Sequence, residues 1–156
     1  MNIDWYVFEE SYLLDINYRI CNSKIIISID DKKSKQHPSA SQIKSYEDTF
    51  EEIKLVLNGV QYYRGINSIK IKDYPNDDIG SIYCIEIVNS QSIEDGLQFK
   101  YKDSSMKISI KNNNKVIGEV SSKTKNVKFV EFVSEMITFR AMVTEYEVIL
   151  NEDNIK

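Results

Sequence analysis

Residues 97–111 read LQFKYKDSSMKISIK, and this stretch decides the fold class. In LQFKYK and again in SMKISIK, large apolar residues alternate with lysine, serine or glutamine. A period of two places the apolar side chains on one face of a β-strand and the polar side chains on the other. The stretch therefore predicts strands over 97–102 and 105–111, with the following core-facing residues: Leu97, Phe99, Tyr101, Met106, Ile108 and Ile110.

The residues on both sides of this stretch extend the β pattern. Three asparagines at 112–114 predict a hairpin, because Asn tolerates the left-handed backbone that such turns require, and the return strand is expected over 116–120. Residues 23–30, SKIIISID, alternate in the same way on Ile25, Ile27 and Ile29. Further strands are predicted over residues 12–20, 66–72, 80–89, 126–133 and 136–150. The last of these also has some helical spacing, but its Val, Ile, Thr, Phe and Tyr content favours a strand.

The pair Asn58-Gly59 is the strongest two-residue hairpin signal in the chain. As a hairpin it would join a strand over 53–57 to a strand over 60–64. A glycine bulge within one long strand is the alternative, because a bulge also uses the positive φ that glycine adopts.

Short strands at this spacing, without a helical stretch of a dozen residues, predict a mostly β protein with little helix. We expect an antiparallel β-sandwich or a partly closed barrel. The chain has 156 residues and its composition is that of one globular domain, so we expect a single domain over 1–156. Residues 31–48, DKKSKQHPSASQIKSYED, are polar and predict a long loop that is either mobile and functional or disordered.

The sequence lacks the common catalytic and cofactor-binding motifs. It has no Gly-x-Ser-x-Gly elbow, no His-Glu-x-x-His, no Walker loop and no dinucleotide fingerprint, and its single histidine excludes a His-rich metal centre. A Cys-His pair of His37 with Cys21 or Cys84 stays open, as does a pair of carboxylates. Both cysteines lie in apolar strand sequences, where Cys usually behaves as a small core residue. We therefore expect no enzymatic activity, no cofactor and no metal.

Residues 73–80, DYPNDDIG, combine three carboxylates with turn-forming residues. An EF-hand loop that began at Asp73 would need a ligand where Pro75 stands, a glycine where Asp78 stands and a glutamate where Cys84 stands. The motif fails at all three places, although a looser calcium or magnesium cluster stays open. Pro, Asn and Gly are residues that turns select for backbone reasons. The stretch predicts a solvated connection between two strands, with an acidic tip that could contact a basic partner.

Charge is unevenly distributed along a chain whose net charge is −4. Residues 98–128 contain eight lysines and two acidic residues, whereas residues 131–153 contain six acidic residues and one arginine. The outward positions of the two strands in 97–111 carry four lysines: Lys100, Lys102, Lys107 and Lys111. The aromatic residues of these strands face inward, so no stacking platform accompanies the lysines and nucleic-acid binding is not favoured.

Three segments resemble the layout of a class of small bacterial proteins: SYLLDINYRICNSKIIISID, FEEIKLVLNGVQYYR and EMITFRAMVTEYEVIL. The class comprises small β-rich proteins of uncharacterised families and immunity proteins of polymorphic toxin systems. The similarity is one of pattern, without signature residues. It implies a cytoplasmic protein that binds one partner tightly and blocks it, without chemistry of its own. The acidic, aromatic N-terminus differs from an export signal, and no apolar run is long enough to span a membrane, which agrees with a cytoplasmic location.

Exposed aromatic residues beside carboxylates are the candidate contacts with such a partner, for example a basic toxin domain, because aromatics bury large areas and acidic groups steer basic proteins. Trp5 is expected in the core. The residues predicted to bind the partner are Tyr63, Tyr74, Asp73, Asp77 and Asp78. Two alternatives stay open: a small enzyme that uses carboxylates in a barrel mouth, and a structural or assembly protein of a phage or surface system.

Overall fold

A computed structural model describes residues 1–67, 80–88, 93–94, 97–102, 105–112, 115–123 and 127–151. For residue 88 and for 93–112 and 116–123 within these ranges, it describes only the backbone. Within the described ranges there are twelve strands and five 3₁₀ turns of three residues each. The turns are η1 (Ile3–Trp5), η2 (Phe8–Glu10), η3 (Ile20–Asn22), η4 (Ala40–Gln42) and η5 (Glu47–Thr49). The strands are β1 (Tyr12–Arg19), β2 (Lys24–Lys32), β3 (Phe50–Asn58), β4 (Tyr62–Asn67), β5 (Ile82–Val88), β6 (Ile93–Glu94), β7 (Leu97–Lys102), β8 (Ser105–Asn112), β9 (Lys115–Lys123), β10 (Lys128–Ser134), β11 (Ile137–Val143) and β12 (Glu145–Leu150).

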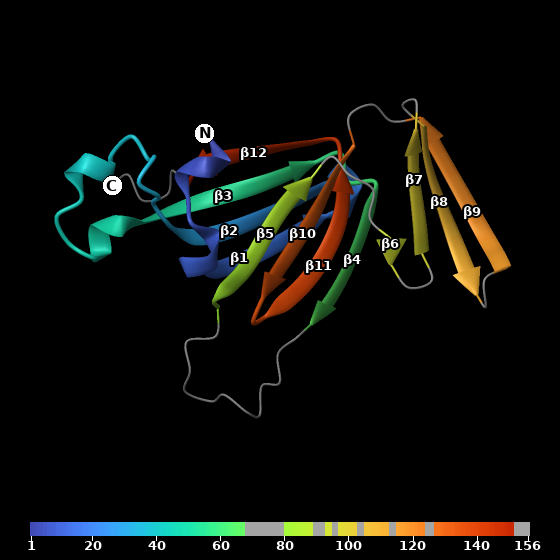
Figure 1. Cartoon of the computed structure of the whole chain (residues 1–156), viewed down its shortest axis with the longest axis horizontal. Coiled ribbons are helices and arrows are strands. Elements are labelled where there is room, and N and C mark those ends of the chain that lie inside the picture. Colours follow the sequence, from blue (N-terminus) through green and yellow to red (C-terminus); the bar gives the residue numbers. More distant parts are fainter. Residues whose placement is uncertain are drawn as a thin grey trace.

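The strands form three antiparallel sheets of four strands each, in the orders β1-β2-β3-β12, β4-β11-β10-β5 and β6-β7-β8-β9. In Figure 1 the strands of the second sheet cross in front of those of the first at a steep angle, and β7, β8 and β9 stand to one side. The sheets do not close into a barrel, so the predicted mostly β, antiparallel fold with little helix is confirmed as a sandwich.

The core lies between the first two sheets. From β2 and β3 it receives Ile25, Ile27, Ile29, Ile53, Leu55 and Leu57, all fully buried. The second sheet contributes Phe132 and Phe139, whose rings stack with their centroids 5.0 Å apart. The alternation on β2 therefore has the predicted direction. Trp5 is half-buried and packs against this core from the N-terminal segment.

The predicted hairpin at Asn58-Gly59 is wrong, because β3 and β4 belong to different sheets. β3 pairs with β12, and β4 pairs with β11, so one long antiparallel ribbon passes from the first sheet into the second. Between the pairs Asn58–Glu145 and Tyr62–Met142, three residues of one strand oppose two of the other. The extra residue is that of a bulge, and strands that switch sheets in crossed sandwiches turn the corner at such bulges. The alternative prediction, a bulge at Gly59, is therefore confirmed.

Gly59 supplies the backbone conformation at this corner, with φ of +61°. The Thr144 amide donates to the Asn58 carbonyl at 3.1 Å, and the Gln61 amide donates to the Met142 carbonyl at 2.8 Å. On the other strand the predicted 136–150 segment is divided at Thr144 into β11 and β12. Hydrogen bonds thus continue around the bend on both sides of the bulge.

A second, shorter junction joins the two sheets at the start of β1. Tyr12 and Ser81 form an isolated antiparallel bridge. The Leu13 amide donates to the Gly80 carbonyl at 2.7 Å, and the Ile82 amide donates to the Ser11 carbonyl at 3.0 Å. The contact spans only these residues, so it fastens the N-terminal segment without closing a barrel.

In the third sheet, β8 and β9 pair with Asn112 opposite Lys115, which confirms the hairpin predicted at the asparagine run. β7 pairs with β8 and brings Lys100 opposite Lys107 in the backbone register. The predicted strand over 66–72 lies within the described residues only as far as Asn67, where β4 ends.

The predicted loop over 31–48 is shorter than expected. Asp31 and Lys32 belong to β2, and Asp31 is fully buried. The remainder contains the turns η4 and part of η5, so it has a defined path. The polar composition of the segment did not indicate that β2 continues to Lys32, because a carboxylate seldom occupies an inward strand position.

Candidate binding face

The predicted partner-binding residues fall in two groups. Tyr63, on β4, is half-buried, and its ring lies 5.5 Å from the ring of Phe139 and 5.0 Å from that of Tyr18. Burial, and then the nearby Tyr18, raises the pKa of the Tyr63 hydroxyl. Tyr63 therefore contributes to the margin of the core. The other predicted residues lie outside the described residues: Asp73, Tyr74, Asp77 and Asp78. The DYPNDDIG stretch lies between β4 and β5 in the sequence and, apart from Gly80, outside the described residues.

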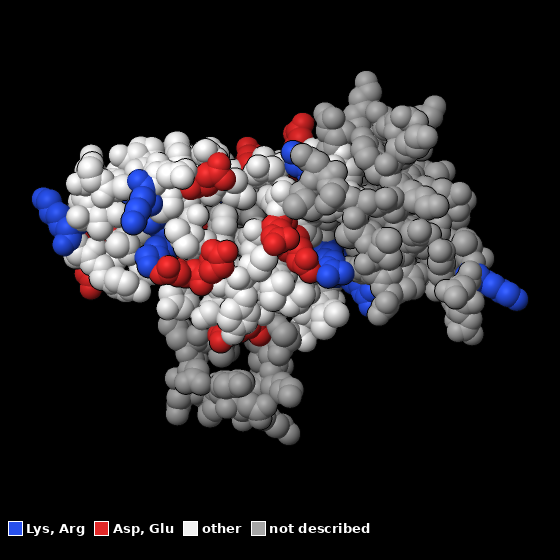
Figure 2. Space-filling view, in the orientation of Figure 1, with Lys and Arg blue, Asp and Glu red and all other residues white. Residues whose placement is uncertain are grey.

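The outer face of the β4-β11-β10-β5 sheet carries a row of four charged residues. The strand registers align Glu86 with Glu131, Glu131 with Arg140, and Arg140 with Arg64. Arg140 Nε and Nη2 both donate to Glu131 Oε1, at 2.9 and 2.7 Å. In Figure 2 acidic side chains accordingly gather over β5 and β10, with basic side chains beside them toward β4. The row makes the β5 side of this face acidic.

Tyr83 stands at the acidic side as an exposed aromatic residue. Its side chain is 54% exposed, and its hydroxyl donates to Glu135 Oε1 at 2.9 Å. The register shifts here, since Val133 pairs with Cys84 but Ser134 pairs with Ile82. Tyr83 is thus the extra residue of a bulge on an edge strand, and bulges redirect side chains in this way.

Cys84 lies beside Tyr83 and is half-buried. Burial, and then the carboxylates of Glu86, Glu131 and Glu9, raises the pKa of its thiol. A thiol in these surroundings is not activated as a nucleophile, because the reactive form is the thiolate. Cys21 is exposed in η3, so the expectation that both cysteines lie in the core is wrong for Cys21.

We define the binding face by six residues from η2, β5 and β10 and the turn after β10: Glu9, Tyr83, Cys84, Glu86, Glu131 and Glu135. It combines an exposed aromatic residue with four carboxylates, which is the combination that the sequence predicted for other residues. The signal was present in the sequence of β5. Ile82 and Ile85 are three positions apart, and an odd separation places two residues of a regular strand on opposite faces. Both can face the core only if a bulge adds one residue between them.

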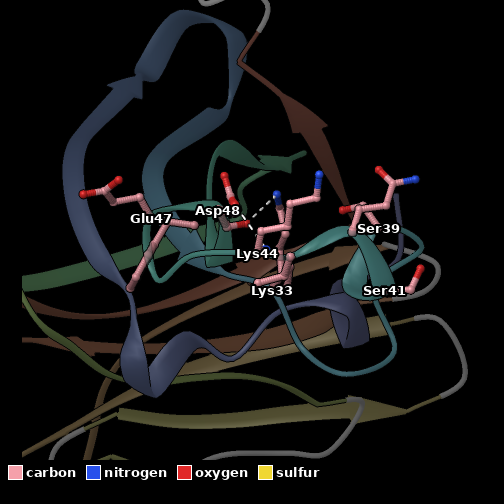
Figure 3. Close-up of a pocket in the computed structure, with 9 residues that line it drawn as sticks. Lys33, Ser39, Ser41, Lys44, Glu47 and Asp48 are labelled. Atoms are coloured by element: carbon pink, nitrogen blue, oxygen red, sulfur yellow. Dashed lines mark hydrogen bonds between the residues drawn. The ribbon is translucent and has the colours of Figure 1, made fainter.

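A second candidate region is an open hollow of about 830 Å³ beside the loop between β2 and β3. Its lining includes Lys33, Ser39, Lys44, Glu47 and Asp48, and Figure 3 shows Asp48 close to Lys44 while Glu47 points away from them. Hydrogen bonds from the Lys44 backbone and from Ser45 lower the pKa of Asp48, whose Oδ2 accepts both amides. Asp48 thus closes a turn, and an ionised carboxylate occupied in this way is a poor general acid.

His37 belongs to the same loop and is only 9% exposed. Its Nδ1 accepts the Ser39 amide at 3.1 Å and lies 2.9 Å from Ser39 Oγ, and its Nε2 lies 3.4 Å from Glu51 Oε2. Tyr6 Oη donates to the same Glu51 oxygen at 2.9 Å. Because Nδ1 accepts a hydrogen bond from the Ser39 amide, this histidine holds the backbone of the loop in place. Cys21, beyond the opposite end of β2, is too distant to pair with it, since a nine-residue strand spans about 30 Å.

Across the described ranges, no group of three or more His, Cys, Asp or Glu residues is placed to hold a metal ion. In the same part of the chain, no helix has the length and apolar character needed to cross a bilayer.

Comparison of the chain with protein-family models, with curated proteins and with solved structures gives no match. The resemblance to immunity proteins remains a hypothesis.

Proposed function

We propose that the protein acts by binding one protein partner through the binding face, without chemistry of its own. A cytoplasmic immunity protein that neutralises a basic toxin domain is the most specific form of this proposal. The observation that carries it is Tyr83, a large aromatic side chain held exposed by a bulge and bordered by carboxylates. Tyrosine is enriched among residues that dominate binding energy, because it buries a large area with few rotatable bonds.

The charges around Tyr83 favour a basic partner. Glu9 and Glu86 are exposed, Glu131 lies opposite Glu86 in the strand register, and Glu135 accepts the hydrogen bond of Tyr83. Carboxylates at the rim of an interface accelerate association with a positively charged protein, and salt screens this effect. The chain as a whole has a net charge of −4, which acts in the same direction.

The test is an affinity capture from the native cells with the tagged protein and two variants. Tyr83→Ala removes the proposed anchor. Tyr46→Ala is the matched control, because Tyr46 is 70% exposed but lies on the loop between β2 and β3. One stoichiometric partner retained by the wild type and by Tyr46→Ala, and lost by Tyr83→Ala, is the expected result. Equal capture by all three proteins would exclude this face, and capture of nothing would contradict a dedicated binding function.

A further inference from the structure

Asp31 is a fully buried carboxyl group near the end of β2. Its Oδ1 is hydrogen-bonded to Ser11 Oγ, and its Oδ2 has no hydrogen-bond partner. Burying a charged carboxylate is costly unless both oxygens are compensated. The surroundings of this residue therefore disfavour its ionised form.

The hydrogen bonds of Ser11 lead to the same conclusion. Ser11 Oγ accepts the Lys32 amide at 2.9 Å, and it lies 2.9 Å from the Val7 carbonyl, which can only accept. The hydroxyl has a single proton. If Asp31 is ionised, both Asp31 Oδ1 and the Val7 carbonyl need this one proton, and only one of them can accept it. If Asp31 is protonated, the carboxyl donates to Ser11 Oγ and the hydroxyl donates to the Val7 carbonyl. All three contacts of Ser11 Oγ are then hydrogen bonds.

Among the described residues, the charged groups that act on Asp31 supply no compensating positive charge. Asp30 of the same strand and Glu9 of η2 both act on it, and both are negative. On β3, Glu51 lies opposite Asp31 in the register, and its carboxylate accepts from Tyr6. The ammonium of Lys32 is paired with Glu10. Burial raises the pKa of Asp31 to about 7, against the Ser11 hydroxyl and the nearby Lys32 amide, which lower it.

We propose that Asp31 and Ser11 form a pH-sensitive latch, in which the protonated carboxyl holds the Val7–Ser11 segment on β2 and its ionisation loosens that segment. The latch works on a short piece of backbone. Val7 donates to the Lys32 carbonyl at 2.8 Å, and beyond it η2 departs from the strand until Tyr12 pairs with Asp30. Between these points Ser11 Oγ takes the place of a backbone acceptor for Lys32.

The direction of the pH effect follows from proton binding. Between about pH 4, where an unfolded aspartate ionises, and about pH 7, the folded protein keeps a proton that the unfolded chain has lost. Stability is therefore highest at the acidic end of this window and falls as the pH rises through it, by up to about tenfold in the folding constant per pH unit. Above the window the contribution is constant.

The test compares denaturant unfolding of the wild type, Asp31→Asn and Asp30→Asn from pH 5 to pH 9. An asparagine amide can donate to Ser11 Oγ as the protonated acid does, but it cannot ionise. We expect the unfolding constant of the wild type to rise relative to Asp31→Asn by about tenfold per unit up to neutral pH, and then to level off. Asp30→Asn removes a neighbouring charge and keeps the latch. The ratio of its unfolding constant to that of the wild type should therefore change far less between pH 5 and pH 9.

A second measurement uses the wild type alone. The carboxyl carbon of Asp31, followed by NMR, is expected to titrate with a midpoint near pH 7. The protection of the Lys32 amide against hydrogen exchange, relative to its intrinsic rate at each pH, should fall above that pH. A midpoint near pH 4, or the same pH dependence in Asp31→Asn, would overturn the proposal. Glu9 belongs to both the Val7–Ser11 segment and the binding face, so any effect of the latch on binding rests on the proposed function. Both experiments use the isolated protein, and they therefore test the latch independently of binding.

Discussion

At the scale of single residues, Gly59 has the most demanding position in the described chain. Its φ of +61° is one that residues with a Cβ seldom adopt, and an added Cβ would lie 2.1 Å from Thr144 Oγ1. The sequence indicated a glycine-dependent bend at this point. It could not decide between a hairpin and a bulge, because both use the same local conformation and only the sheet partners distinguish them.

We expect Gly59→Ala to lower the free energy of unfolding by about 2–4 kcal/mol, from the left-handed backbone and the steric contact with Thr144. Denaturant unfolding of a double-mutant cycle with Thr144→Ala separates the two causes. Removing Oγ1 should relieve most of the contact in the Gly59→Ala background and leave about 1 kcal/mol from the backbone. Strictly additive effects of the two substitutions would show that the contact does not exist.

At the scale of elements, alternation predicted most of the described strands, and in β2 the alternating isoleucines do face the core. Alternation did not predict a bulge, a bend from one sheet into another, or a polar residue at an inward position. The bulge at Tyr83 exchanges the faces of β5, and the corner at Gly59 divides one ribbon between two sheets. Asp31 continues the inward positions of β2 with a polar side chain. These features depend on partners distant in sequence, which a local pattern does not contain.

The loop between β2 and β3 is a test of how a polar segment is held in place. His37 is packed 5.7 Å from the ring of Trp5 and 5.6 Å from that of Tyr6, and it accepts the Ser39 amide. We expect His37→Ala to lower the free energy of unfolding by about 1–3 kcal/mol and to accelerate amide exchange in residues 33–46, because a buried anchor and its hydrogen bond are both lost.

Lys35→Ala is the control for this prediction, because Lys35 is exposed in the same loop. Hydrogen exchange followed by mass spectrometry resolves the loop from the strands. Unchanged exchange of the loop in His37→Ala would mean that the two 3₁₀ turns hold it without the histidine.

At the scale of the whole molecule, the acidic side chains of the binding face lie on the side of the β4-β11-β10-β5 sheet that is turned away from the core. The acidic residues of this face come from η2, β5, β10 and the turn that follows β10, so only the folded chain brings them together. The sequence predicts a site of the same kind, an aromatic residue beside carboxylates, at Tyr63, Asp73, Tyr74, Asp77 and Asp78, and the last four lie outside the described residues. The local sequence does not indicate that Tyr83 is exposed, because a tyrosine in an apolar strand is ordinarily a core residue.

The charges of the face predict how binding responds to salt. Reversing two carboxylates, Glu86→Lys and Glu135→Lys, should slow association with a basic partner and reduce the salt dependence of the association rate, with a smaller effect on dissociation. Glu47→Lys with Glu145→Lys is the matched control, because it makes the same change in net charge at exposed positions outside the face.

The measurement that tests the binding face most directly is the association rate of the captured partner with these two variants and the wild type, at low and at high salt. The proposed face predicts that Glu86→Lys with Glu135→Lys slows association by about tenfold or more at low salt, that the control pair has a much smaller effect, and that high salt brings the three rates together. Equal rates for the two double variants at low salt would contradict it, because the effect would then belong to net charge and not to this face.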